Sequence, residues 1–545
     1  MTRKSPAVRF AFSFWPGIGA AALLLGFSIL VFAHILSLPQ AKGSINLDSR
    51  VWSTLLFTLF QAGLSTLLSL VAGTAIAWSL LHQRRFFGRN ILVALFSSAL
   101  VLPTLVAVLG LVTVFGRNGW INGLAEALTG TSFGPFIYGL AGILIAHVYF
   151  NASFAVRGLL NRLESVPHER WKLARSLGFT AWQRFRFIEW PAMKSALPGI
   201  GITIFLLCFT SFAIVLVLGG SPRYNTLEVA LYEAVKLDFD LAQAVGLALV
   251  QIVVCAGLVL VAASIRSSVT AAAKSSYQSA WPEPAAARWC QYAIIAFAGF
   301  GFIAPLTAVI YDGLQAEFSR LVTAPTFVRG FFTSLLIATA SSLLTVMLAL
   351  AIGMARRNFN VPGRFSPNFW TRMTDRALAF SGTLFLAVPS LVLGLGMFLI
   401  ARQFAGPLVY WTVAAVLCAN VLMALPFSLA ILTPALEKSA LRFDRLCFSL
   451  GITGIARWRY AEWPLLRGDL GYVVALAFCF SLGDLGVIAL FGSQNFATLP
   501  WLLYQNMGSY RTHDAAGIAL ILLALIVAIF TIVPRIFSGK SHVEA

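Results

Sequence analysis

Two stretches of the sequence place arginine, glutamate and tryptophan at matching positions. The first, SLGFTAWQRFRFIEWP, runs from Ser176 to Pro191, and the second, SLGITGIARWRYAEWP, runs from Ser449 to Pro464. Both interleave charged side chains with aromatic ones, a pattern suited to binding at a membrane surface or in a groove of a protein partner. These residues therefore predict binding to a membrane surface or to a protein partner.

Spacings typical of catalysis or metal binding do not occur. The sequence has no HExxH, no Ser/His/Asp grouping or carboxylate pair at usable spacing, and no G-x4-G-K-[ST] nucleotide loop. His147 and His513 are isolated, and the six cysteines form no CxxC pair. We therefore expect no catalytic residue, no metal and no cofactor bound by this chain, which disfavours a membrane-bound enzyme.

The composition is that of an integral membrane protein. Of 545 residues, 59% are hydrophobic and 11% are charged, against about 25% charged residues in soluble domains. A bilayer-spanning helix needs about 20 mostly apolar residues. The sequence offers about twelve such stretches, centred in 14–36, 53–80, 91–115, 136–158, 197–219, 241–263, 291–311, 331–354, 377–401, 408–432, 469–491 and 515–537. An all-α fold without a sizeable soluble domain follows.

The net charge of +19 reflects topology. If the N-terminus is cytoplasmic, most Lys and Arg residues fall in cytoplasmic segments, as the positive-inside rule requires. Basic clusters such as Arg84-Arg85, Arg356-Arg357 and Arg372/Arg376 lie just beyond expected helix ends. We expect a multi-pass protein of a bacterial inner membrane with both termini cytoplasmic, an uncleaved first span, and no nucleic-acid partner.

The matching stretches belong to a longer internal duplication. LLFTLFQAGLSTLLSL from Leu55 resembles FFTSLLIATASSLLTV from Phe331, and Pro103 in VLPTLVAVLGL aligns with Pro389 in AVPSLVLGLGM. Six spans in each half give two parallel repeats in the same orientation. We predict a first repeat over residues 1–265, a cytoplasmic linker over 266–289 and a second repeat over 290–545, with the longest charged loops at about 160–195 and 434–468.

Local signals divide the first of these loops into two short helices. Pro167 is typical of a helix start, and Gly178 of a helix end in the left-handed conformation. Thr180 and Gln183 form a possible capping box for the next helix. The second copy keeps the glycine and threonine but changes the proline and glutamine (Gly451, Thr453, Ala440 and Ala456). We expect the first loop to be the better-ordered helix-turn-helix, and replacement of its Gly178 to be the more damaging one.

The first loop also resembles a known family motif. Its pattern Ala174-x3-Gly178-x9-Ile188-x2-Pro191 is similar to the EAA loop of ABC-transporter permeases of the binding-protein-dependent import type. The second copy reads Cys447-x3-Gly451-x9-Ala461-x2-Pro464. The family's Glu-Ala-Ala falls here on Lys172-Leu173-Ala174 and Arg445-Leu446-Cys447, so a basic contact replaces the family's glutamate.

The resemblance implies an ABC importer permease fold and a set of partners. In that family the loops dock on ATP-hydrolysing subunits, so ATP is used by two copies of a separate cytoplasmic ATPase, and a periplasmic binding protein delivers a small-molecule substrate. The loop residues to which the resemblance assigns coupling are Ala174, Arg175, Gly178, Thr180, Trp182 and Arg184 in the first copy, and Cys447, Gly451, Thr453 and Arg457 in the second.

The fused twelve-span plan resembles the ferric-iron and thiamine branch of these importers. The stretches FGRNGW, AHVYFN, FRFIEWP, SLGDLGVIALFG and TLPWLLYQNMGSYRTHDAA resemble its thiamine-transporting members, which implies uptake of thiamine or its phosphate esters. Alternatives are a ferric-iron permease of the same branch and a proton-coupled carrier with twelve helices. Each loop taken alone also fits an interfacial amphipathic segment.

Asp484 is the clearest ionisable residue within a predicted span. A charge at mid-bilayer costs roughly 2.5–3.5 kcal/mol, so its side chain should face the bundle interior or a wet cavity. It either attracts a cationic substrate along the translocation path or hydrogen-bonds a neighbouring helix at a Gly-rich kink, between Gly483 and Gly486. The external residues Glu228, Glu233, Asp238 and Asp240, and the later stretch NFATLPWLLYQNMGSYRTHD, form either a docking surface for the binding protein or solvated connectors.

Overall fold

The computed structural model describes residues 14–37, 49–264, 283–361, 368–386, 388–401, 408–492 and 496–538. Within these ranges the chain is helical and contains no strand. Residues 266–282 of the predicted linker lie outside the described residues, and so do the N-terminal residues 1–13. Helix α14 begins at Ala285, inside the predicted linker.

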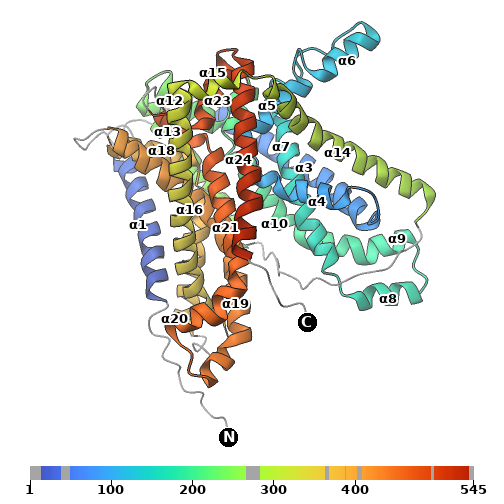
Figure 1. The fold of residues 1–545 in the computed structure, drawn as a ribbon, viewed down its shortest axis with the longest axis vertical. Helices are drawn as coiled ribbons and strands as arrows, with labels where there is room; N and C mark the ends of the chain where they lie inside the picture. The colour runs from blue at the N-terminus through green and yellow to red at the C-terminus, as the bar shows by residue number, and fades with distance from the viewer. Residues whose placement is uncertain are drawn as a thin grey trace. The chain divides into compact units, whose positions relative to one another are not determined.

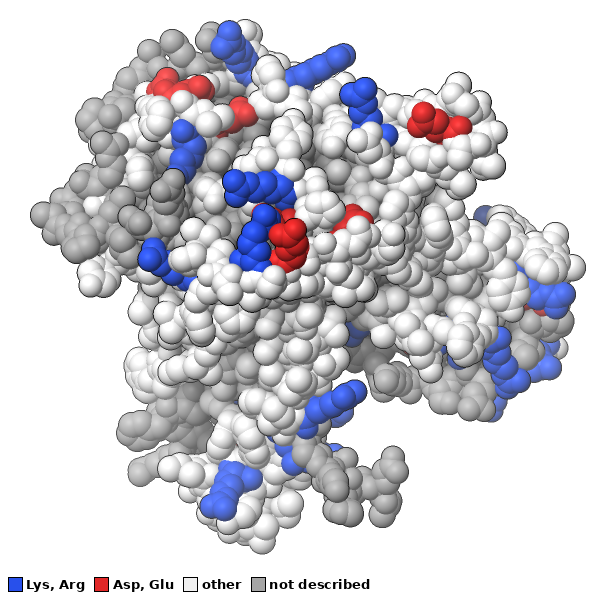
Figure 2. Space-filling model, turned by 45° about the horizontal axis from the view of Figure 1, so that its top comes forward, with Lys and Arg blue, Asp and Glu red and all other residues white. Residues whose placement is uncertain are grey.

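Eleven helices within the described residues are long and apolar enough to cross a membrane. Each overlaps one of the about twelve spans expected from the sequence. The remaining stretch, 377–401, is divided into two shorter helices. In Figure 2 the surface along the helices is largely uncharged, and Lys, Arg, Asp and Glu side chains lie near the helix ends, as the bilayer requires of lipid-facing surface.

The contacts divide the chain into two compact units (Figure 1). Unit A comprises residues 47–233 and 249–316, and unit B comprises residues 1–46, 234–248 and 317–545. Unit A contains α3 (Ser49–His82), α4 (Arg89–Ser98), α5 (Thr104–Phe115), α6 (Trp120–Thr129), α7 (Leu140–Glu164), α8 (His168–Ser176), α9 (Ala181–Arg184), α10 (Trp190–Phe209), α11 (Ala213–Leu218), most of α12 (Leu227–Lys236) and α13 (Leu241–Ser264), and α14 (Ala285–Leu314).

Unit B contains the remaining helices: α1 (Trp15–Ser37), α15 (Phe318–Thr323), α16 (Pro325–Asn360), α17 (Phe369–Thr383), α18 (Ser390–Ala401), α19 (Leu408–Ser449), α20 (Gly454–Arg457), α21 (Trp463–Gly483), α22 (Gly486–Phe491), α23 (Leu499–Gly508) and α24 (Thr512–Ser538). In Figure 1, α15 and α23 lie at one end of this unit and α20 at the other.

The first helix of each predicted repeat packs in the unit built by the other repeat. In unit B, Gly17 of α1 lies so close to α16 that a Cβ would stand 2.4 Å from the Ala351 carbonyl oxygen. In unit A, Tyr149 stacks on Phe302 of α14, with ring centroids 4.7 Å apart. The compact units therefore do not follow the predicted boundaries 1–265 and 290–545, and the repeats stay a prediction from sequence similarity.

The third span of each predicted repeat is broken at the aligned prolines. A 3-10 turn over Ala99–Val101 precedes Pro103, and another over Leu384–Leu386 precedes Pro389. Proline has no backbone N–H to continue the hydrogen-bond ladder. The late spans are broken too, between α10 and α11 and, at Asp484, between α21 and α22. Such interruptions persist in a membrane where the freed backbone groups are buried within protein.

Candidate functional site: two loops held by buried ion clusters

The first loop, which we define as residues 165–190, is a helix-turn-helix. Helix α7 ends at Glu164, Pro167 caps α8, and Gly178 ends α8 with a φ of +67°. The N–H of Phe179 donates to the Ala174 carbonyl over 3.0 Å, the closing bond of a left-handed helix end. Thr180 and Gln183 then form both bonds of a capping box, as the sequence predicted.

A π-helical turn follows in the first loop, over Phe185–Glu189. Pro191 comes directly after Trp190 and has no N–H to bond the carbonyl four residues earlier, which favours the wider turn. Phe185 stacks between Trp182 and Trp190, with centroids 5.8 and 6.1 Å away. These rings, with Trp78, line an apolar hollow of about 740 Å³ on unit A.

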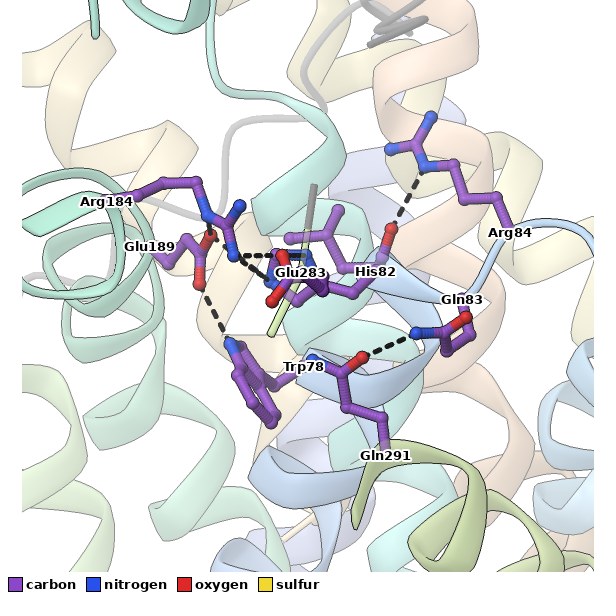
Figure 3. Close-up of polar contacts among 9 residues, drawn as sticks. Trp78, His82, Gln83, Arg84, Arg184, Glu189, Glu283 and Gln291 are labelled. Atoms are coloured by element: carbon purple, nitrogen blue, oxygen red, sulfur yellow. Dashed lines mark hydrogen bonds and ion pairs between the residues drawn. The ribbon is translucent and has the colours of Figure 1, made fainter. Parts of the chain in front are cut away.

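Arg184 is the centre of a buried ion cluster beneath this turn (Figure 3). Its side chain is 1% exposed; its Nε lies 2.7 Å from Glu189 Oε1, and its Nη2 contacts Glu283. His82, the last residue of α3, lies 3.2 Å from both carboxylates. Trp78 Nε1 donates to Glu189 Oε2 over 2.9 Å. The cluster therefore connects the first loop to α3 and to Glu283, which lies just before α14.

Glu283 is anionic in this setting. Burial by itself raises the pKa of its carboxyl group, but the contacts with His82 and Arg184 outweigh burial and hold the pKa below its ordinary value. The first loop is thus stabilised by a carboxylate that lies 99 residues away in sequence from Arg184.

The second loop, defined as residues 438–463, has the same turn as the first loop, but a different helix arrangement leads into it. Gly451 has a φ of +64°, and the Ile452 N–H donates to the Cys447 carbonyl over 2.8 Å. The turn is again followed by a π-helical turn, over Trp458–Glu462. However, α19 runs unbroken through Ala440, which stands where the first loop has Pro167, to Ser449. Thr453 makes no side-chain cap bond.

Arg457 and Glu462 form the ion pair of the second loop. Arg457, 6% exposed, places its Nε 2.7 Å from Glu462 Oε1 and its Nη2 2.5 Å from Asp444 Oδ1. Arg357 Nη1 of α16 reaches the same Glu462 oxygen over 2.7 Å. Two guanidinium groups therefore share one carboxylate oxygen inside unit B.

Outside these clusters, both loops expose apolar side chains at the same positions. Each exposed large apolar residue of the first loop has an exposed apolar counterpart 273 residues later. The pairs are Leu173/Leu446, Leu177/Leu450, Trp182/Ile455, Phe187/Tyr460 and Trp190/Trp463. An amphipathic segment that turns the same set of apolar side chains outward twice presents two equivalent docking surfaces.

The predicted coupling residues fall into an exposed and a buried set. Exposed are Arg175, Gly178, Thr180, Trp182, Gly451 and Thr453, and buried are Ala174, Arg184, Cys447 and Arg457. The two buried arginines hold the loops in place, so any part that they take in coupling is one of positioning. Sequence reasoning missed the other members of the two ion clusters, Trp78, His82, Glu283, Arg357 and Asp444. The Arg-x4-Glu spacing occurs in both loops and could have predicted the two ion pairs.

Asp484 caps the break between α21 and α22. Its Oδ1 accepts a hydrogen bond from the Gly486 N–H over 3.2 Å, and the side chain is half-buried. A Cβ on Gly486 would lie 2.5 Å from Ser390 Oγ, so the two broken spans of unit B meet at their interruptions. Asp484 thus bonds the kink of its own span, and both a bond to a neighbouring helix and a place on a translocation path stay predictions.

The external acidic residues of the first half are mostly engaged within the fold. Glu228 is fully buried and accepts from Gln251 Nε2 over 3.0 Å. Asn225 Nδ2 donates to Glu233 over 2.5 Å, and Asp240 caps α13. The later external stretch instead lines a polar hollow of about 570 Å³ in unit B. Its ionisable lining residues include Arg320, Arg511, His513 and Asp514.

The amino-acid sequence is similar to those of known membrane transport proteins. Residues 65–270 match the family described as binding-protein-dependent transport system inner membrane component. The thiamine transport system permease protein ThiP of Brucella abortus is 40% identical over 529 residues, covering 96% of this chain and 94% of the relative. The proteins of that name from Escherichia coli K12 and Haemophilus influenzae are 38% and 36% identical over 527 residues, covering 96% and 94% of this chain and the same shares of the relatives.

Proposed function

The chain belongs to the family of binding-protein-dependent transport system inner membrane components, in the group of the thiamine permeases, and from this membership we propose that it is the membrane-spanning subunit of an ATP-driven importer. Thiamine or its phosphate esters are the proposed substrate, because the full-length relatives are thiamine permeases. The permease alternates between outward-open and inward-open states and hydrolyses nothing itself.

The duplicated loop surface is the observation that carries the mechanism. Two loops expose matching apolar side chains, and each is fixed by a buried Arg–Glu pair at 2.7 Å. A buried ion pair with further partners resists displacement, because breaking it leaves an uncompensated charge. When two copies of a cytoplasmic ATPase bind these surfaces, a movement of the first loop would therefore also move α3 and α10 of unit A. A movement of the second loop would also move α16 and α21 of unit B.

This role fixes the orientation in the membrane. The loops, the basic helix ends and both termini lie on the cytoplasmic side of a bacterial inner membrane, in agreement with the positive-inside rule. The polar hollow around Arg320 and Arg511 at the α15–α23 end of unit B then faces the periplasm. It supplies polar surface for a substrate-binding protein.

Charge placed on the docking surfaces tests the proposal. Leu177→Asp and Leu450→Asp each put a carboxylate where we propose that an ATPase groove closes on the loop, and we expect the ATPase to be lost on co-purification while the permease still folds. Leu128→Asp is the matched control: it alters another exposed leucine, on α6 at the opposite end of unit A (Figure 1). Retention of the ATPase by both loop variants would refute the coupling role.

The substrate is tested on the partner that selects it. We expect the co-purified binding protein to bind thiamine, its monophosphate or its diphosphate in calorimetric titration, and uptake into vesicles to follow that preference. Binding of ferric iron instead would support the ferric-iron alternative. Uptake driven by a proton gradient without any ATPase would support the proton-coupled carrier. Neither alternative gains support from the relatives.

A further inference from the structure

Helix α17 of unit B begins at the end of the unit that carries the second loop. Arg356 Nε of α16 lies 3.1 Å from Asp375 Oδ1 of α17, and the adjacent Arg357 contacts Glu462 of the second loop. These two contacts place the start of α17 beside the basic helix ends. The proposed coupling function does not use this helix.

The outward face of α17 combines apolar and basic side chains. Phe369, Trp370 and Met373 are exposed in the first turn, and Phe380 is exposed further along. Arg372 and Arg376 are also exposed, and their spacing of four residues puts them on one helix face. Long basic side chains beside apolar ones are typical of a membrane interface, where the charge reaches the headgroup level and the stem stays in hydrocarbon.

The two arginines border a hollow of about 490 Å³. Its lining residues are Asn368, Phe369, Arg372, Met373 and Arg376. Within the part of the chain that the structure describes, neither guanidinium group has a carboxylate or carbonyl acceptor. Two cationic groups without an acceptor on the protein, set beside exposed apolar surface, match a ligand that is anionic at one end and apolar at the other.

The corresponding basic segment of unit A behaves differently. Arg84 Nε donates to the Leu81 carbonyl over 3.1 Å. Arg89 Nη2 donates to the Leu80 carbonyl over 3.3 Å and lies 3.9 Å from Glu164. Arg84 and Arg89 are thus satisfied by the protein in unit A, whereas Arg372 and Arg376 remain available in unit B.

We propose that α17 binds one acidic phospholipid. The phosphate lies between the Arg372 and Arg376 guanidinium groups, which bind phosphate oxygens in a planar, bidentate geometry. The acyl chains pack along Met373 and Phe380. A phosphorylated peptide or nucleic acid would leave this apolar face in water, so a lipid is the ligand that satisfies both halves of the surface.

Native mass spectrometry of the full chain in detergent tests the proposal, with dioleoyl phosphatidylglycerol and dioleoyl phosphatidylcholine as probes. We expect phosphatidylglycerol to be retained in preference to phosphatidylcholine. The double variant Arg372→Gln/Arg376→Gln should weaken phosphatidylglycerol binding at least about tenfold, because each arginine near a headgroup contributes to anionic-lipid affinity. Arg85→Gln/Arg186→Gln removes two exposed arginines from unit A and should leave that binding unchanged.

A third variant and a competition experiment test the same lipid site independently. Met373→Glu leaves both arginines in place but adds a carboxylate beside them, and it should lower phosphatidylglycerol binding even if the double variant misfolds. Inorganic phosphate at equal concentration should not displace the lipid. Equal retention of phosphatidylglycerol by wild type and Met373→Glu, equal loss in the unit A control, or displacement by inorganic phosphate would each overturn the α17 lipid site.

Discussion

The first and second loops use the same ion pair but different partners to hold it. Arg184–Glu189 and Arg457–Glu462 have the same sequence spacing and the same 2.7 Å separation. In the second loop the further carboxylate, Asp444, comes from the helix that leads into the turn. The first loop has Trp171 at the matching position and takes its further carboxylate from Glu283, just before α14.

The difference changes the charge balance of the two clusters. The second cluster has two arginines and two carboxylates, so its formal charges cancel at any pH near neutrality. The first cluster has one arginine, two carboxylates and His82, and its charges cancel only when the imidazole is protonated. A duplicated turn can therefore keep its shape while the two copies differ in their sensitivity to pH.

The largest expected effect comes from removing the shared carboxylate of the second loop. Glu462→Gln leaves Arg357 without the carboxylate that it shares with Arg457, and breaking a buried pair costs about 3–5 kcal/mol. Glu189→Gln should cost less, since Arg184 keeps Glu283. Thermal unfolding in detergent, followed by intrinsic fluorescence, ranks the two variants. Equal losses would show that the two clusters are energetically equivalent despite their different partners.

The next effect concerns the turn glycines. Gly178→Ala and Gly451→Ala each force an L side chain into the left-handed conformation at φ of +67° and +64°, at a cost of about 1–2 kcal/mol. Neither added Cβ meets another atom within 4 Å, so the local strain should be equal. Protease cleavage rates in each loop measure that strain. Greater loss of transport from Gly178→Ala would then assign the asymmetry to coupling, as the sequence predicts.

A smaller effect distinguishes the helix caps. Gln183→Ala removes one half of the first capping box and should destabilise the loop by about 1 kcal/mol. The reverse change, Ala456→Gln, should give no matching gain, because Gly454 has a φ of +59° where a regular first turn needs helical backbone. Hydrogen exchange at the amides of the two loops reports both changes. Protection gained by Ala456→Gln alone would contradict this explanation.

The smallest effect is a pH dependence confined to the first loop. The folded pKa of Glu283 lies below its ordinary value, so its stabilising contribution is complete above the unfolded pKa and is lost as pH falls through the folded pKa. We expect protease cleavage of the first loop to rise below about pH 4.5 relative to cleavage of the second loop. Glu283→Gln should remove this difference. A pH response that survives in Glu283→Gln would assign it to another group.

Local sequence signals predicted the local structure well. Thr180 with Gln183 indicated a capping box, Gly178 a left-handed helix end, and Pro103 and Pro389 an aligned pair, and the structure shows the box, the turn and a broken span at each proline. Each of these features depends on contacts within a few residues. The long apolar stretches also located the spans, because a bilayer demands about 20 apolar residues wherever a helix crosses it.

Long-range packing decided what those signals could not. The family resemblance assigned Arg184 and Arg457 to the coupling loops, and the structure shows that both side chains are buried. Arg184 reaches Glu283, far away in the chain, and Arg457 shares Glu462 with Arg357 of the distant helix α16. Likewise, α1 packs in unit B and α14 packs in unit A. Gly17 of α1 allows a close contact with another helix, and a local sequence pattern does not predict which helix that is. The sequence alone determined the spans, the duplicated turns and the family resemblance. Only the tertiary structure decided which arginines hold the loops and which, such as Arg372 and Arg376, remain available to a ligand, because burial depends on the whole set of neighbouring helices.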